Sequence, residues 1–278
     1  MPFVASLAHA LFAALAVMLP GAGALAAEPL PSSDSAERRC PGLVADMPGA
    51  QFVDFTRAAL GNGEVRLTYV GHATFLIASP QHVRIATDYN DFVRPPVVPD
   101  IATMNHAHST HYTHAPDPRI KFVLRGWSDD GSQPVHDLSF EDVRVRNVPT
   151  NIRDWAGGTE RYGNSIFIFE IAGLCIAHLG HLHHTLTKQQ LDEIGRLDVV
   201  LAPVDGTYTL DLDGMIEVLH ALNARIAIPM HYFSTLTLER FLDRTRQEWE
   251  VETNATPSIV LSRATLPEKA KVLLLPGH

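Results

Sequence analysis

The sequence is poor in cysteine. Among 278 residues it holds only Cys40 and Cys175, and neither has metal-ligating neighbours along the chain. An exported protein could pair them. However, Cys175 lies in the apolar run 174–177 and Cys40 in a loop-like segment. We therefore expect two unpaired thiols and assign neither to a metal.

Positive charge is also scarce. There are 22 Lys and Arg against 31 Asp and Glu, a net charge of −9, and no basic stripe is interleaved with aromatic residues. This balance argues against general binding of nucleic acid or of anionic membranes. We expect a small-molecule substrate and no nucleic-acid partner, while the oligomeric state stays open.

The apolar run Leu7–Leu19 is short for a membrane span. Pro20-Gly21 and Ala24-Leu25-Ala26 follow it, which is the pattern of a secretory signal peptide, although no Lys or Arg precedes the run. We expect cleavage near Ala26 or Ala27, a periplasmic or secreted product and no membrane span afterwards; an uncleaved N-terminal anchor is the alternative. The predicted organisation is a signal peptide at 1–27, an extended lead-in at 28–60 and one domain at 61–278.

Short apolar runs dominate the first half of that domain, and several alternate apolar and polar residues as half-buried strands do. They lie at 65–70, 74–78, 83–87, 101–104, 121–124, 143–148, 165–171 and 174–178. Helical patterns at 187–196, 212–222 and 238–249 alternate with apolar runs at 199–203 and 226–229. This alternation predicts an α/β domain with sheets covered by helices.

Histidine is the most informative residue type. His106, His108 and His111 fall within six residues, directly after the predicted strand 101–104. In an extended stretch, residues two apart point the same way, and a turn would bring His111 back towards them. Imidazole is the commonest protein ligand for zinc and similar ions. A His-rich surface loop is the alternative interpretation.

Further polar groups follow other predicted strands, as an active site at one rim of a sheet requires. They are Asp88, His178, His181 and His231. His183 and His184 come just after His181. We expect both to be loop residues; a role in adjusting the site is the alternative.

On these residues the chain resembles the metallo-β-lactamase superfamily, in particular the branch of lactonase-like hydrolases and N-acyl phosphatidylethanolamine phospholipases. The matching segments are Gly71-His72, Asp88, His106-x-His108-x-Thr110-His111, 177–181, 203–206 and 229–232. The resemblance implies a single-domain α/β fold, a four-layer αββα sandwich with the metal at one edge of its two sheets.

The departures from that pattern bear on the metal. Thr110 stands where the family has an aspartate, His181 stands at the metal-bridging aspartate, and Ile152 falls where many relatives have a histidine. The resemblance implies His106, His108, His111 and His231 as ligands, with His181 as a further terminal ligand. Because bridging carboxylates are lost, we expect one divalent ion rather than two: zinc first, with manganese or iron as alternatives.

Other residues are expected to surround the metal without binding it, namely His72, Asp88, Thr110 and His178. Asp205 is a candidate general base, or a group that orients a ligand; a loop aspartate facing water is the alternative.

These features predict an exported metal-dependent hydrolase that cleaves an ester, lactone, amide or phosphodiester through a metal-activated water. The lost carboxylates favour a second hypothesis, a non-hydrolytic metal-binding member that acts as a sensor or carrier. Redox chemistry at a His-rich iron or copper centre is a third. Metal analysis combined with a substrate screen discriminates among them.

Overall fold

A computed structural model describes residues 59–154 and 156–276. The predicted signal peptide, and the lead-in up to residue 58, lie outside the described residues. In the described part, no helix has the length and apolar character needed to cross a membrane.

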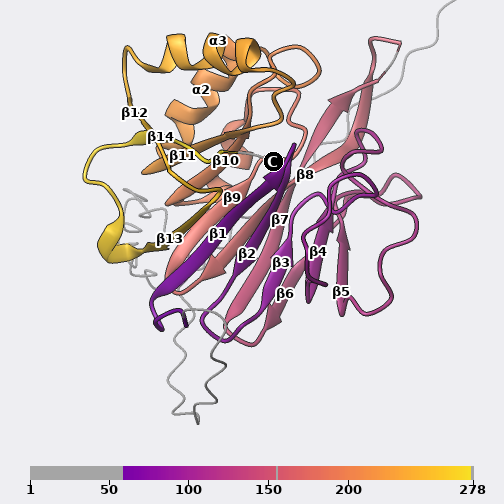
Figure 1. The fold of residues 1–278 in the computed structure, drawn as a ribbon. Coiled ribbons are helices and arrows are strands. Elements are labelled where there is room, and N and C mark those ends of the chain that lie inside the picture. Colours follow the sequence, from indigo (N-terminus) through magenta and orange to yellow (C-terminus); the bar gives the residue numbers. More distant parts are fainter. Residues whose placement is uncertain (1–58, 155, 277–278) are drawn as a thin grey trace, which may run out of the picture. The chain divides into compact units, whose positions relative to one another are not determined.

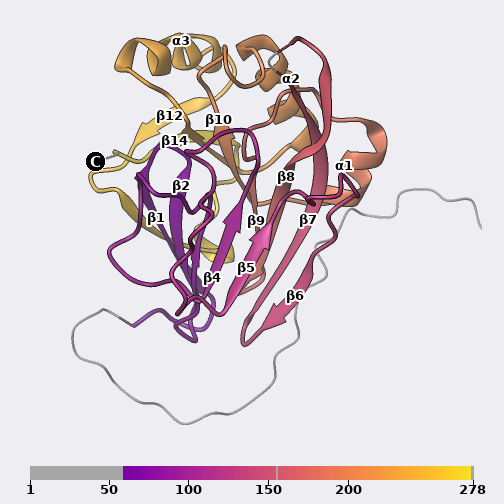
Figure 2. The same ribbon diagram turned by 90° about the vertical axis from the view of Figure 1, so that its right-hand side faces the viewer.

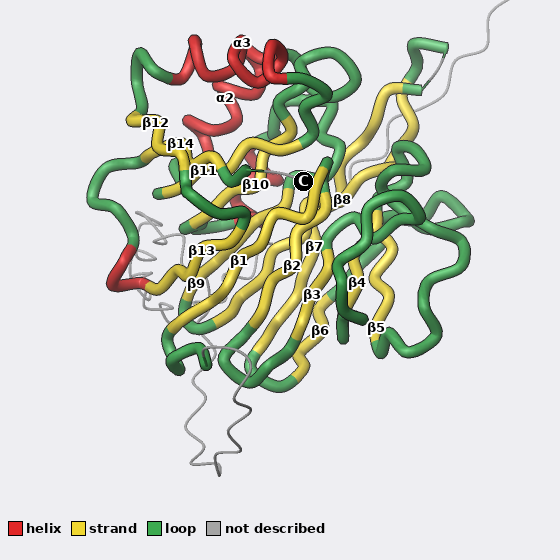
Figure 3. Tube along the Cα trace, viewed as in Figure 1, coloured by secondary structure: helices red, strands yellow, loops and turns green. Residues whose placement is uncertain are grey.

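Two β-sheets form the body of the described domain (Figures 1 and 3). The six-stranded sheet has the order β13-β1-β2-β3-β4-β5, and the eight-stranded sheet has the order β12-β14-β11-β10-β9-β8-β7-β6. The strands of the first sheet are β1 (Glu64–Gly71), β2 (Thr74–Ala78), β3 (Arg84–Ala86), β4 (Ile101–Met104), β5 (Phe122–Arg125) and β13 (Ser258–Ser262). Those of the second are β6 (Asp137–Phe140), β7 (Val143–Arg153), β8 (Thr159–Ile171), β9 (Leu174–His178), β10 (Val199–Pro203), β11 (Ile226–Met230), β12 (Glu250–Thr253) and β14 (Lys271–Leu274).

The main core lies between the sheets. In β1 every second residue is buried, and Leu67 of this strand belongs to the same apolar cluster as Phe167 of β8 and Leu201 of β10. Alternation places one face of each strand against the other sheet. The two-residue period therefore predicts the inner faces correctly.

The helices α1 (Lys188–Ile194), α2 (Leu212–Leu222) and α3 (Thr235–Thr245) share an apolar cluster with the other face of the eight-stranded sheet (Figure 2). A short 3₁₀ helix follows β13 at Arg263–Thr265. Thr187 is the N-cap of the helix predicted at 187–196, with a capping box to Gln190. The helix ends earlier than predicted, at Ile194, because Gly195 with φ 73° is its C-cap.

The outer face of the six-stranded sheet carries a small cluster that includes Ala102 and Met104 of β4. Tyr89 and Ile120, both from loops, belong to the same cluster. The α/β sandwich agrees with the fold class predicted from the sequence.

The expectation of unpaired thiols is wrong for Cys175. This residue is buried in β9 and is disulfide-bonded, while Cys40 lies outside the described residues. An apolar strand buries a half-cystine as readily as a thiol, so burial alone does not distinguish the two.

Candidate metal centre

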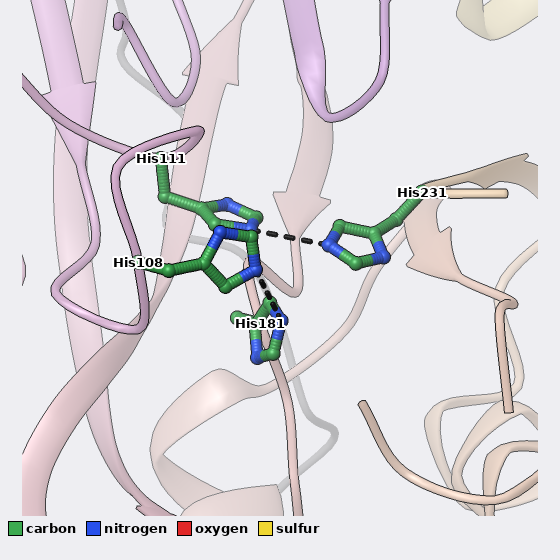
Figure 4. Close-up of side chains that lie close together, drawn as sticks. All are labelled: His108, His111, His181 and His231. Atoms are coloured by element: carbon green, nitrogen blue, oxygen red, sulfur yellow. Dashed lines mark hydrogen bonds between the residues drawn. The ribbon is translucent and has the colours of Figure 1, made fainter. Parts of the chain in front are cut away.

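Four imidazoles meet at one rim of the two sheets (Figure 4). They follow three strands: His108 and His111 come after β4, His181 after β9 and His231 after β11. One nitrogen from each ring can be chosen so that all four lie within 4.8 Å of one another. Nε2 of His108 is 2.9 Å from Nε2 of His181, and Nε2 of His111 is 3.2 Å from Nε2 of His231.

Strand topology explains this gathering. β9, β10 and β11 are parallel neighbours, so their carboxyl ends lie at the same edge of the sheet. After β4 the chain closes a turn in which the His111 N–H donates to the carbonyl of His108 at 2.9 Å, and the Asn105 N–H donates to that of His111 at 3.2 Å. This turn presents His108 and His111 together.

The Nδ1 atom of each of the four rings contacts a separate partner. Thr110 Oγ1 lies 2.8 Å from Nδ1 of His108, Asp88 Oδ2 lies 2.6 Å from that of His111, and Asp205 Oδ2 lies 3.0 Å from that of His231. Such partners fix the ring orientation and leave Nε2 directed inwards.

His181 differs from the other three rings. Its Nδ1 lies 2.6 Å from Nε2 of His183, whose Nδ1 accepts the backbone N–H of Arg153 at 2.6 Å. Neutral His183 therefore carries its hydrogen on Nε2 and donates to His181. A neutral His181 then carries its hydrogen on Nε2, and that hydrogen must leave before this atom can bind a metal.

Burial favours the neutral form of three of these rings, those of His108, His111 and His181. Burial, and then the neighbouring imidazoles, lower the pKa values of His111 and His181 well below the usual value for histidine. The pKa of His108 is lowered by burial and by His231. Neutral imidazole is the form that binds metal.

The two carboxylates behind the rings differ in their electrostatics. Burial raises the pKa of Asp88 to about 6. Burial also raises the pKa of Asp205, but hydrogen bonds from His231 and Thr209 outweigh it and hold that pKa well below the usual range. At pH 7 both groups are thus available as carboxylates to accept from the imidazoles.

The donor set fits a single transition-metal ion. Two nitrogens bound to one tetrahedral zinc at 2.0–2.1 Å lie about 3.4 Å apart, and the two Nε2 pairs lie 2.9 and 3.2 Å apart. Imidazole ligands suit zinc, copper, iron and nickel, whereas manganese prefers oxygen ligands. The chemistry of the donors therefore favours zinc or iron over manganese.

The structure does not bring His106 into this cluster, which corrects the expectation that it converges with His108. The chain bends at residues 106–108 and is not extended there, so alternation does not hold. Nδ1 of His106 lies 2.7 Å from Glu160 Oε1, and its ring stacks on Trp127 at 5.0 Å between centroids.

The residues expected to surround the metal lie close to the four-histidine cluster. His72 Nε2 is 3.0 Å from Thr110 Oγ1. The His72 ring centroid is 4.1 Å from that of His231, and the His72 carbonyl accepts the His231 N–H at 2.8 Å. His178 is buried below, where Nε2 donates to the Ala73 carbonyl at 2.7 Å. His72, Thr110 and Asp88 therefore contact the cluster directly, whereas His178 lies 4.0 Å from Asp88 Oδ2.

Asp205 contacts the ring of His231 and the loop that follows β10. Its Oδ1 accepts the N–H groups of Thr207 and Tyr208 at 2.9 and 2.6 Å. Its Oδ2 accepts from the Thr209 hydroxyl at 2.5 Å and from His231. With both oxygens engaged and only 4% of the residue exposed, Asp205 is not arranged as a general base, and it does not face water.

Two further residues contact His181. His183 is a loop residue as expected, and it is buried against His181, which fits the alternative that it adjusts the site. Asn164 Oδ1 accepts the His181 N–H at 2.8 Å, and no pattern in the sequence indicates this contact.

Comparisons with known proteins identify the family. Residues 66–231 match the family model described as "Beta-lactamase superfamily domain". A UPF0173 metal-dependent hydrolase of Thermoplasma acidophilum is 28% identical over 189 residues, which cover 60% of this chain and 83% of the relative. Another, from Methanoculleus marisnigri, is 24% identical and covers 74% and 99% of the two chains.

Solved structures show the same fold. A proposed Zn-dependent hydrolase of the metallo-β-lactamase superfamily from Thermotoga maritima superposes with a TM-score of 0.58 at 28% identity, covering 77% of this chain and all (100%) of the other. Igni18, a metallo hydrolase from Ignicoccus hospitalis, gives a TM-score of 0.51 at 19% identity, with 77% and 97% covered.

Proposed function

The chain belongs to the β-lactamase superfamily, and on that basis we propose that it is a metal-dependent hydrolase. Its ion would be held by Nε2 of His108, His111 and His231 and, once its Nε2 hydrogen is lost, by Nε2 of His181. The observation that carries the proposal is the inward convergence of these four rings, each fixed by a separate contact at Nδ1. Relatives named metal-dependent hydrolases support the reaction class.

The charge of the site supports one ion rather than two. Two divalent cations close together repel each other unless anionic ligands lie between them. Thr110 and His181 stand where the family's two aspartates would be, and all four converging donors are imidazoles. Asp88 and Asp205 contribute negative charge only from behind the rings, which suits a single cation.

The ion would supply Lewis-acid activation of a water molecule. The residues of the chain orient the ligands and decide from which side substrate approaches. Of the four ligand rings, only His108 is not fully buried, and the half-buried His72 lies beside it, with 6.3 Å between ring centroids. Substrate therefore enters past His108 and His72.

The substrate we propose is a small molecule with an ester, lactone, amide or phosphodiester bond. We further propose that the protein works in the periplasm or outside the cell. The secretory pattern of residues 1–27 supports that location.

One observation favours a second candidate function. Four imidazoles would occupy all four coordination positions of a tetrahedral zinc ion. Zinc sites with four protein ligands are structural, whereas catalytic zinc sites keep one position open for water or substrate. Both carboxylates at the cluster are engaged by imidazoles. A metal sensor or carrier would need no open position, whereas a hydrolase needs a fifth coordination position or the release of one ring.

The two candidates are separated by one set of measurements on the full chain. Protein loaded with zinc or iron is assayed for metal content and for turnover of ester, lactone, amide and phosphodiester substrates. The hydrolase proposal predicts turnover that His111→Ala and His181→Ala abolish, while His106→Ala retains it. Tight stoichiometric metal with no turnover on any class would favour the sensor or carrier.

A further inference from the structure

Two exposed aromatic side chains lie in contact beside the metal cluster. Tyr208 is 59% exposed and Phe233 is 58% exposed. Their ring centroids are 5.5 Å apart at an interplanar angle of 73°. They come from the loops that follow β10 and β11, which are neighbouring strands (Figure 1). We call these two residues the aromatic pair.

The aromatic pair adjoins the reactive part of the site. The Phe233 ring centroid lies 5.3 Å from that of His231 and 5.7 Å from that of His72. His231 is a proposed ligand, and His72 lies on the side from which substrate enters. A molecule that reaches the cluster past His72 therefore passes over Phe233.

Charged groups near the pair are already engaged. The Asp205 carboxylate accepts from the backbone N–H of Tyr208 and from its other partners. Nη2 of Arg153 lies within hydrogen-bond distance of the carbonyls of Thr207, Tyr208 and Thr209, at 3.2, 3.3 and 2.7 Å. What this part of the rim offers a ligand is therefore ring surface.

Single exposed apolar residues are common and need no explanation. Two exposed rings in mutual contact, one of them against two imidazoles of the site, form a surface that an apolar group can cover. In addition, the Tyr208 hydroxyl has no hydrogen-bond partner among the described residues. It can therefore bond to a polar atom of a ligand lying on the rings.

We propose that Tyr208 and Phe233 are specificity-determining residues that bind an uncharged apolar group, an acyl chain or an aryl ring, next to the bond that is cleaved. The statement that a bond is cleaved rests on the proposed hydrolase function. Binding of a ligand to the aromatic pair can be measured without turnover. The substrate class is then an ester, lactone or amide of a lipophilic acid.

Binding is tested by titrating the zinc-loaded chain calorimetrically with acetate, butyrate, hexanoate and octanoate, whose carboxylate mimics a hydrolysis product. Affinity is expected to rise about twofold to fourfold per added methylene, because each buried methylene is removed from water. In Phe233→Ala this dependence on chain length is expected to flatten, while acetate affinity and zinc content stay unchanged. Failure of the wild-type chain to show any length dependence, or to bind any of the four acids, would overturn the inference.

Two variants separate recognition from simple damage to the site. Phe233→Tyr keeps the ring and is expected to keep the length dependence. Val135→Ala removes part of another exposed apolar side chain, 79% exposed and next to the edge strand β6, and is expected to behave as wild type. Equal flattening in Val135→Ala and Phe233→Ala would contradict a specific role for the aromatic pair.

Turnover of p-nitrophenyl esters from acetyl to octanoyl distinguishes this inference from the hydrolase proposal. Length-dependent binding that Phe233→Ala removes, without turnover of any ester, would leave the pair established and the hydrolase wrong. Turnover with kcat/KM independent of length, in wild type and Phe233→Ala alike, would leave the hydrolase standing and the inference wrong. A change from dimer to monomer in Phe233→Ala by sedimentation would also overturn it, since the rings would then be covered by a second copy of the chain.

Discussion

Asp205 Oδ2 accepts a hydrogen bond from Nδ1 of His231 at 3.0 Å, and the ring turns its Nε2 towards the other imidazoles. Asp88 does the same for His111 from the opposite sheet. In this chain the two carboxylates therefore hold the imidazole rings in place and do not themselves converge on the cluster.

The Asp205→Asn substitution tests that relationship. The amide can still accept from the loop N–H groups, but its NH₂ then faces Nδ1–H of His231. This favours the tautomer with hydrogen on Nε2, which does not bind metal. We expect metal affinity to fall about 10- to 100-fold, measured by competition with a chelator.

Asp142→Asn is the matched control for Asp205→Asn. Asp142 accepts from the Ser79 hydroxyl and the Gln81 N–H at 2.6 and 3.0 Å, at the other end of β2 from Gly71 and His72. Its replacement should leave metal affinity unchanged. Equal affinities for all three proteins would show that Asp205 does not orient a ligand.

Single alanine substitutions distinguish a histidine of the cluster, His111, from His106, which lies nearby in sequence but outside the cluster. His111→Ala should lose most of the bound metal, because the ring is fully buried among the converging nitrogens. His106→Ala should keep it, since that ring pairs with Glu160 and stacks on Trp127. The metal-to-protein ratio of each variant gives the answer, and a ratio near zero for His106→Ala would contradict the geometry.

The metal-free chain should lose stability as pH falls below about 6.5. His111, His178 and His181 are buried, and burial lowers the pKa of each in the folded chain. Below the pKa of an unfolded histidine, the unfolded chain therefore binds more protons than the folded one. Each such group then lowers the free energy of unfolding by about 1.4 kcal/mol per pH unit.

Asp88 opposes this trend but does not reverse it. Its pKa is raised to about 6 in the folded chain, so between its unfolded value and pH 6 the folded chain binds the extra proton. That contribution is lost as pH rises through 6. It comes from one carboxyl group, whereas several histidines, His108 among them, act in the other direction. Urea unfolding in the presence of a chelator should give a lower midpoint at pH 5.5 than at pH 7.5; an equal or higher midpoint would contradict this balance.

Gly180→Ala should damage both the fold and the site. Gly180 has φ +61°, and a Cβ there would lie 2.3 Å from Asn164 Oδ1 and 2.5 Å from Asn105 Nδ2. Those amides bond to the N–H of His181 and to Asp88. We expect a loss of about 3 kcal/mol in unfolding free energy from backbone strain plus overpacking, together with weaker metal binding.

Gly131→Ala is the control for Gly180→Ala. Gly131 has φ +73°, and nothing lies within 4 Å of its added Cβ. Gly131→Ala should lower the free energy of unfolding by only about 1 kcal/mol, because the left-handed backbone is its one source of strain. Metal binding should be unchanged. If thermal or urea unfolding showed similar losses of unfolding free energy for the two variants, the contacts with Asn164 and Asn105 would not contribute to stability.

Much of the fold could be predicted from the sequence. The runs 74–78, 101–104, 174–178 and 199–203 are observed strands with those bounds, and 212–222 is an observed helix, because each buries a clear apolar face. β6, β12, β13 and β14 were missed. β12 is mostly exposed, and β6 and β12 are edge strands, so such segments carry little apolar pattern.

The site was predictable only in part. His181 and His231 follow β9 and β11, which lie on either side of β10 in a parallel arrangement and therefore end at a common edge. His111 reaches them from the end of β4 in the other sheet. His106 was misplaced because a four-residue strand gives no warning that the chain bends directly after it. The contact of His183 depends on the backbone N–H of Arg153, 30 residues away, which no local pattern shows.

Anomalous X-ray scattering from crystals of the zinc-loaded full chain tests the central claim most directly. The account predicts one zinc peak per chain, bound by Nε2 of His108, His111, His181 and His231, with His106 still paired to Glu160. Two peaks, a peak bound by His106, or no peak among the four rings would contradict it.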